Sequence, residues 1–124
     1  MNSKVLLALR IIFGLFLLMF GFNKFFHFIP MGEMGEAAGT YFGALMSTKT
    51  ITMIAIVEIL AGLSLLLDKY AALMMLILMS ISVNAVLFHA TLAPDSIGGA
   101  AVLLILNIVM LYAYKDKYKD LLSA

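Results

Sequence analysis

Few side chains in this sequence can take part in acid–base chemistry, ion pairing or ligand recognition, and they form two groups. Arg10 and Glu58 carry opposite charges inside long apolar stretches, whereas Lys24, His27 and His89 stand near the ends of such stretches. These side-chain types can form an ion pair, transfer a proton or hydrogen-bond a ligand. The chain has no cysteine, which excludes thiolate catalysis, disulfide exchange and cysteine-bound zinc or iron–sulfur centres.

The remainder of the chain is so apolar that its composition indicates whether the protein lies in water or in a membrane. Of 124 residues, 65% are apolar and 12% are charged. An average soluble domain is about half apolar and about a quarter charged. Because so short a chain would leave much apolar surface in water, we expect one integral membrane domain (1–124) and exclude most soluble enzymes. A net charge of +1 offers no basic patch for nucleic acid.

Four segments have the length and apolar character of membrane-spanning helices, which need roughly 20 residues. They cover about residues 5–28, 51–67, 70–92 and 97–114. The longer connection, which contains GEAAGTYFGALMSTK, predicts a short helix at the outer surface, although its glycines also fit a mobile loop. The expected fold is therefore all-α: an antiparallel four-helix membrane bundle with one short surface helix between the first two spans.

The basic residues predict the orientation of the bundle. Lys4, Lys69 and the lysines of the carboxyl-terminal tail fall on one side, with Arg10 just inside, and the other side has Lys24 and Lys49. Cytoplasmic loops carry the excess of basic residues. We therefore expect both termini in the cytoplasm, with the protein in a bacterial inner membrane. Its expected contacts are lipid and, since four short helices bury little, a second copy of the chain.

Small and charged residues share one stripe on each of the first two spans. At 100° per residue, one stripe contains Arg10, Gly14, Gly21 and Lys24, and the other contains Glu58 and Gly62. Glycines in such stripes let two helices approach closely and keep charges away from lipid. We therefore expect the first two spans to pack together through Gly14, Gly21 and Gly62.

Depth within the membrane suggests how the charges pair. Counted at 1.5 Å per residue from the cytoplasmic ends of their helices, Arg10 lies roughly 9 Å deep and Glu58 roughly 13 Å deep. This predicts a buried Arg10–Glu58 ion pair, with Asn107 at nearly the same depth donating its amide to the carboxylate. The pair has two interpretations: a structural staple that fixes helix register, or the polar floor of a ligand pocket or a proton-linked carboxylate.

A second polar group is expected at the outer end of the bundle. Lys24 and His27 lie three residues apart on one helix face, and His89 reaches the same level from the third span. Two interpretations remain open for them, anchoring at the membrane interface or hydrogen bonding to a ligand such as a quinone. Two histidines without nearby carboxylates are a poor metal signature, so no metal site is expected. Asn84 and Asn107 are interpreted as polar partners inside the bundle.

The pattern of these positions resembles a known family. The segments RIIFGLFLLMFGFNKFF, VEILAGLSLLLD and NAVLFH, in a four-span chain of this length, are similar to the DoxX family of small bacterial inner-membrane proteins. The resemblance implies a link to membrane redox chemistry, because the family is named after a subunit associated with thiosulfate and quinone oxidoreduction in an archaeon. Some relatives are thought to join membrane oxidoreductase complexes. The family has no agreed catalytic residues, so none is carried over.

The resulting functional hypothesis is a DoxX-like accessory or ligand-binding subunit of a membrane redox complex, with a quinone- or lipid-like ligand. No haem-ligand signature is present, so the chain is not expected to be a complete enzyme alone, and its catalytic residues are unknown. Two alternatives stay open: a small proton-linked transporter built on Glu58, and a structural scaffold without chemistry.

Overall fold

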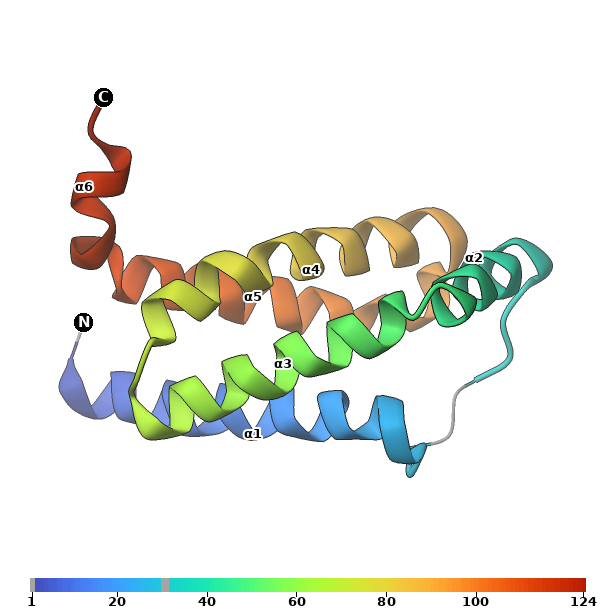
Figure 1. Ribbon diagram of the computed structural model, residues 1–124, viewed down its shortest axis with the longest axis horizontal. Coiled ribbons are helices and arrows are strands. Elements are labelled where there is room, and N and C mark those ends of the chain that lie inside the picture. Colours follow the sequence, from blue (N-terminus) through green and yellow to red (C-terminus); the bar gives the residue numbers. More distant parts are fainter. Residues whose placement is uncertain (1, 30–31) are drawn as a thin grey trace.

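The computed structural model describes residues 2–29 and 32–124, and all the regular structure in these ranges is helical (Figure 1). In chain order the elements are α1 (Ser3–Phe26), α2 (Glu36–Ser47), α3 (Thr50–Leu67), α4 (Ala71–Leu92), the 3-10 turn η1 (Pro94–Ser96), α5 (Ile97–Ala113), the 3-10 turn η2 (Lys115–Tyr118) and α6 (Lys119–Leu122). Four of these helices, α1, α3, α4 and α5, form the predicted antiparallel bundle.

The surface of the bundle confirms that it is a membrane protein. Each of the four long helices is long and apolar enough to cross a bilayer. Large apolar side chains lie exposed along them, for example Ile12 at 59% and Ile105 at 60%. In water this surface would be strongly unfavourable, whereas lipid chains cover it at no cost. The all-α membrane bundle expected from the sequence is therefore confirmed.

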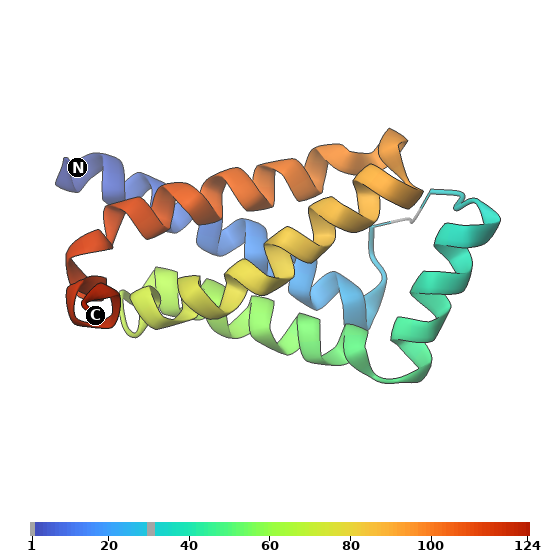
Figure 2. The same cartoon turned by 90° about the horizontal axis from the view of Figure 1, so that it is seen from above.

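The two ends of the bundle differ. The amino and carboxyl termini lie together at one end, which we call the proximal end (Figure 1). Helix α2 lies across the opposite, distal end, roughly perpendicular to the long helices (Figure 2). It begins after Gly35, and its last turn is closed by the hydroxyl of Thr48, which donates to the Ala44 carbonyl at 2.9 Å. The predicted surface helix is thus present, and it covers one end of the bundle.

Helices α1 and α3 approach most closely where glycines face each other. A Cβ on Gly62 would lie 2.8 Å from the carbonyl oxygen of Gly14, and one on Gly21 would lie 3.1 Å from the carbonyl oxygen of Ala55. Real Cβ atoms essentially never show the first distance, and the second is tighter than most real contacts. The three glycines of the predicted stripes therefore lie at the α1–α3 contact and allow its short backbone separation.

The apolar core is concentrated toward the proximal end. Its largest fully buried side chains come from all four long helices: Phe13, Leu17, Leu65, Met75, Leu78 and Met110. These side chains fill the proximal half of the bundle, so the space between the helices is closed there. The distal half is packed differently, and that difference creates the site described below.

One fully buried polar residue joins α4 to α5. The side-chain amide of Asn107 donates to the Met75 carbonyl at 3.0 Å, and its oxygen accepts a hydrogen bond from the Ser82 hydroxyl at 2.7 Å. The predicted hydrogen bond from Asn107 to Glu58 is therefore wrong. Asn107 faces α4, the neighbour to which α5 is joined by a short turn, so its amide is used within that helix pair.

Replacing Asn107 with leucine is expected to destabilise the protein by about 1 kcal/mol, the usual size of an interhelical hydrogen bond in a membrane protein. The measurement is thermal unfolding of detergent-solubilised protein. Asn84→Leu is the matched control, because Asn84 is exposed and its amide donates at 2.8 Å to Ser80 of its own helix. Equal melting temperatures for the two variants would contradict a structural role for Asn107.

Candidate functional site

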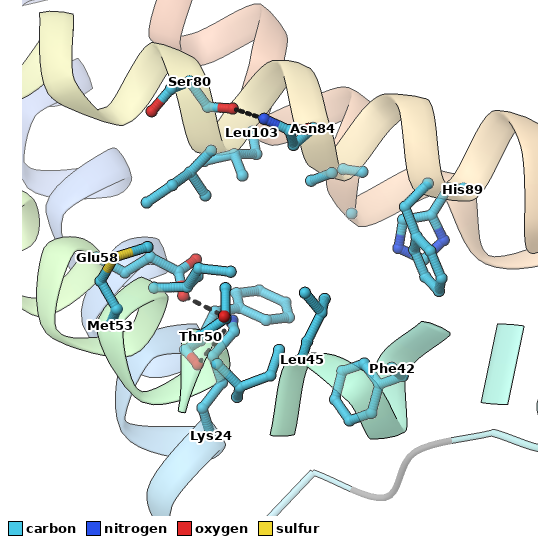
Figure 3. Close-up of a pocket in the computed structure, with 18 of the residues that line it drawn as sticks. Lys24, Phe42, Leu45, Thr50, Met53, Glu58, Ser80, Asn84, His89 and Leu103 are labelled. Carbon is cyan, nitrogen blue, oxygen red and sulfur yellow. Dashed lines mark hydrogen bonds and ion pairs between the residues drawn. The ribbon is translucent and has the colours of Figure 1, made fainter. Parts of the chain in front are cut away.

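The distal half of the bundle encloses a cavity of about 570 Å³, lined by residues of all five larger helices (Figure 3). This volume lies within the usual range for small-molecule sites, roughly 300–1,000 Å³. The cavity exists because the proximal core ends near mid-membrane, and because α2 covers the distal end without filling the space beneath it. A cavity of this size inside a small bundle is the main candidate for function.

Aromatic and aliphatic side chains form most of the cavity wall. Phe16 and Phe20 of α1 pack against each other with ring centroids 4.7 Å apart. Tyr41 of α2 stacks on Phe88 of α4 with ring centroids 5.2 Å apart, which fastens the covering helix to the bundle. Such a wall favours an apolar ligand, so the few polar groups in the cavity decide how that ligand would be oriented.

The most strongly polar feature of the cavity is an ion pair between α1 and α3. The Lys24 ammonium lies 2.6 Å from Oε1 of Glu58, and the Glu58 side chain is 4% exposed (Figure 3). The ammonium also lies 3.5 Å from the Phe20 carbonyl. Lysine carries its charge on a flexible stem, which lets the Lys24 ammonium reach Glu58 on the neighbouring helix. Both charges therefore stay inside the bundle and away from lipid.

Helix α4 and the turn that follows it supply the other polar groups of the cavity. Ser80 and Asn84 lie on one face of α4, on the opposite side of the cavity from Glu58 (Figure 3). Nδ1 of His89 lies 3.0 Å from the Ser96 hydroxyl and 3.3 Å from the Ala93 carbonyl. These contacts fix the imidazole ring and leave its Nε2 atom available to a ligand. Ser80 was not predicted, although its spacing of four residues from Asn84 is a usable signal.

The structure brings together only part of the predicted outer cluster. Lys24 and His89 both line the cavity, but His27 does not. Helix α1 ends at Phe26, and His27 takes a left-handed conformation with φ of 53° while its side chain is exposed. The prediction assumed that the helix continued to residue 28, which would have kept His27 on the same face as Lys24. Including His27 in the cluster was therefore wrong.

The predicted Arg10–Glu58 ion pair is also corrected. Glu58 pairs with Lys24, whereas Arg10 lies at the proximal end and contacts the last turn of α3. The depth count assumed that α1 and α3 end at the same level. In fact α1 has 24 residues and α3 has 18, and the first turns of α1 extend beyond the end of α3 (Figure 1). Arg10 therefore lies level with Asp68, and Lys24 is the cation within reach of Glu58.

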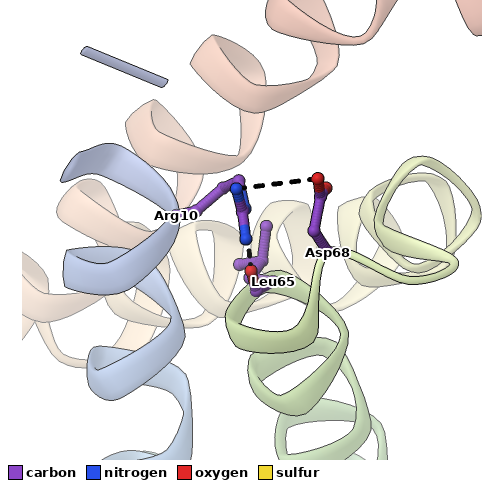
Figure 4. A network of polar contacts seen from close by, with 3 residues as sticks. All are labelled: Arg10, Leu65 and Asp68. Atoms are coloured by element: carbon purple, nitrogen blue, oxygen red, sulfur yellow. Dashed lines mark hydrogen bonds and ion pairs between the residues drawn. The ribbon is translucent and has the colours of Figure 1, made fainter. Parts of the chain in front are cut away.

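At the proximal end, Arg10 stabilises the carboxyl terminus of α3 (Figure 4). Its Nε donates to the Leu65 carbonyl at 2.9 Å, and Nη1 lies 3.6 Å from the carboxylate of Asp68, which is 57% exposed. A cation at this end of a helix satisfies free carbonyl groups and interacts favourably with the helix dipole. Asp68 was predicted only as part of a short connection, so its pairing with Arg10 was missed. This arrangement is structural.

A tyrosine hydroxyl attaches the carboxyl-terminal tail to the same end of the bundle. Tyr118 donates to the Ala72 carbonyl at 2.7 Å. Burial raises the pKa of Tyr118 to about 12, and the nearby Tyr114 adds to this effect. The hydroxyl therefore remains a protonated donor at any physiological pH. Burial also raises the pKa of Tyr114, with a further contribution from the negative charge of Asp68.

Comparison with known proteins identifies the family. The model of the DoxX family matches residues 5–91, which is more than half of the chain. The chain belongs to the DoxX family. No curated protein and no solved structure matches it. The DoxX match includes Lys24, Glu58, Asn84 and His89, so these cavity residues belong to the shared part of the chain, while Asn107 lies beyond it.

The cavity of this DoxX protein offers hydrogen-bond donors and acceptors on an apolar background. Among residues 2–29 and 32–124, no three histidine or acidic side chains are close enough to hold a metal ion. The polar groups that line it include the Lys24 ammonium, the Glu58 carboxylate, the Asn84 amide and the His89 imidazole. This set suits the recognition of an oxygen-containing head group that is attached to an apolar body.

Proposed function

We propose that this DoxX protein is an accessory membrane subunit that binds a quinone- or lipid-like ligand in the distal cavity. The observation that carries the proposal is the buried Lys24–Glu58 pair at one side of a 570 Å³ apolar cavity inside a membrane bundle. A structural ion pair alone needs no empty space beside it, whereas a ligand site needs both the space and the polar groups.

The chemistry of the cavity fits a quinone head group. Quinone carbonyl oxygens accept hydrogen bonds, and an ammonium has three N–H donors. The Lys24 ammonium directs one N–H toward Glu58 and one toward the Phe20 carbonyl, which leaves the third for a ligand. His89 and Asn84 offer further donors on the opposite side of the cavity. A flat head group placed between the two sides would have donors near both of its carbonyl oxygens.

The proposed role is accessory because the chain has no thiol for electron transfer. A bound quinone would exchange its electrons with a partner oxidoreductase subunit in the same membrane. We place the protein in a bacterial inner membrane with both termini in the cytoplasm, following the excess of basic residues at the proximal end. The distal cavity would then lie in the outer half of the bilayer.

A proton-linked transporter built on Glu58 is favoured less. A carrier has to open a path from its binding site to each side of the membrane. Here the proximal half is filled by the apolar core, including Phe13, Met75 and Met110, each fully buried. Glu58 faces the distal cavity, and the core separates it from the proximal end. A scaffold without chemistry is favoured less because the polar groups converge on the cavity.

The test of the proposal is quinone binding to the purified protein in lipid nanodiscs. We expect menaquinone or ubiquinone to bind the wild type, and His89→Ala to weaken binding by about fivefold to tenfold, the effect of losing one hydrogen bond. His27→Ala is the matched control, since His27 is an exposed histidine outside the cavity and its replacement should leave the affinity unchanged. Equal and negligible retention of both quinones by all three proteins would refute the proposal.

A further inference from the structure

The cavity has an opening on one side of the bundle, between α3 and α4. These two helices start from a short turn at residues 68–70 and diverge toward the distal end (Figure 2). Glu58 and Ser80 are equally far from this turn along the chain, and they face each other across the cavity (Figure 3). Phe16 and Phe20 of α1 and Leu103 of α5 line the opposite wall of this space. The gap between the diverging helices is one open side of the cavity.

The exposed fractions of the lining residues indicate on which side the cavity opens. On the α3–α4 side, Met53 is 55% exposed, and Ser80 and Asn84 are also exposed although they line the cavity. On the α1 and α5 side, Phe16 and Phe20 are half-buried and Leu103 is 5% exposed. Ser80 is near the middle of α4, so the opening lies at the depth of the lipid chains rather than at the water surface.

Polar side chains at this opening are costly unless something covers them. Ser80 and Asn84 satisfy part of their hydrogen bonding with carbonyls of α4, at 2.9 and 2.8 Å. Within the described residues, the side-chain oxygen of Asn84 accepts no hydrogen bond. A polar group that faces hydrocarbon is unfavourable, and such positions in membrane helices usually serve a ligand pathway or a partner. Here both residues also line the cavity, which favours a ligand that passes between them and α3.

We infer that the ligand is a single-chain amphiphile that enters from the bilayer between α3 and α4. Its oxygen-containing head group lies between Lys24–Glu58 and Asn84, and its apolar chain leaves past Met53 and Ser80 into the surrounding lipid. This inference rests on the proposed function and adds the entry route and the class of ligand. A prenylquinone and a single-chain phospholipid share this chemistry, so the experiment has an arm for each.

The size and lining of the site support this orientation. The Glu58 carboxylate is buried, whereas Met53 at the opening is 55% exposed, apolar and flexible, which suits contact with a mobile chain. A ligand without a chain would leave the opening to lipid and expose Asn84 to it. The volume of about 570 Å³ lies in the range of small-molecule sites, which favours a head group with one chain over a lipid with two.

The test blocks the opening and compares ligands with and without a chain. Ser80→Phe and Met53→Trp each place a ring in the gap, from α4 and α3 respectively. Val83→Phe is the matched control, because Val83 is 47% exposed on α4 and does not line the cavity. The probes are a decyl-substituted benzoquinone, the same head group without its chain, and a single-chain lysophosphatidylglycerol, each titrated into protein in nanodiscs.

We expect the two blocking variants to bind the decyl quinone about tenfold more weakly than the wild type and Val83→Phe. The head group without a chain should bind all four proteins with equal, lower affinity. If lysophosphatidylglycerol shows the same pattern instead of the decyl quinone, the entry route stands and the head group is a phospholipid. Unchanged affinity of the chain-bearing probes in both blocking variants would overturn the route while leaving the proposed function intact.

Two further outcomes separate the possible failures. Absence of binding of every probe to the wild type would refute the proposed function and this inference together. Light scattering would show whether the wild type is a dimer that Ser80→Phe disrupts. If it is, and if probe binding is unchanged, the gap is covered by a second copy of the chain. That result would overturn the inference, because the opening would not then be exposed to lipid.

Discussion

Lys24→Met is expected to destabilise the protein by about 3–5 kcal/mol, the cost of leaving one partner of a buried ion pair without its counter-ion. The Glu58 side chain is 4% exposed, so little solvent reaches the carboxylate to replace the lost ammonium. Glu58→Gln should cost less, because the Lys24 side chain is 24% exposed and flexible enough to move its charge toward the membrane surface. The double variant with both changes should recover most of the loss. Denaturant unfolding in detergent micelles measures all three.

The Arg10–Asp68 ion pair at the proximal end, in which the carboxylate is exposed, is the control for this prediction. Asp68→Asn removes the partner of Arg10, but Asp68 is 57% exposed and lies 3.6 Å away, so its loss should cost at most about 1 kcal/mol. The two pairs therefore differ in burial while sharing the same kind of interaction. Similar stabilities of Lys24→Met and Asp68→Asn would mean that the Lys24–Glu58 pair is solvated rather than buried in the bundle.

The four spans were predictable because hydropathy alone determines which segments lie in lipid. The pairing of charges was not, because it depends on the register between antiparallel helices. Each helix end was estimated to within a few residues, and an offset of one turn moves a side chain by about 5 Å. Arg10 lies level with Asp68, ten residues and about 15 Å along the chain from Glu58, so an error of about two turns assigned Glu58 to Arg10 in place of Lys24. The residue pattern of each span predicts which helix faces meet, but it does not predict the register between the two helices.

The cavity itself was only partly predictable. Lys24 and His89 were expected near each other, since both stand near the outer ends of their spans. The short helix was expected at the outer surface, but nothing in its pattern predicted that Phe42 and Leu45 would line the cavity. An empty space between helices leaves no pattern in the sequence. It results from the directions of the helices, which depend on side-chain packing throughout the bundle.

The glycine contact between α1 and α3 connects stability to the site, and Gly62→Ala tests this connection. The added Cβ would lie 2.8 Å from the Gly14 carbonyl oxygen, a backbone atom that cannot rotate away. One of the two helices must therefore shift. Alanine favours a helix over glycine by about 1 kcal/mol, but overpacking costs about 1–3 kcal/mol. We therefore expect a net loss of up to about 2 kcal/mol in denaturant unfolding.

The same substitution should weaken ligand binding, because Lys24 lies on α1 and Glu58 on α3. A shift between these helices changes the only ion pair that the described residues place inside the cavity. Gly98→Ala is the control: Gly98 is also helical, yet no atom lies within 4 Å of a Cβ at that position. It should keep full binding and gain up to about 1 kcal/mol from helix propensity. If Gly62→Ala were as stable as Gly98→Ala and bound quinone equally well, the close approach of α1 and α3 would be unimportant for both fold and site.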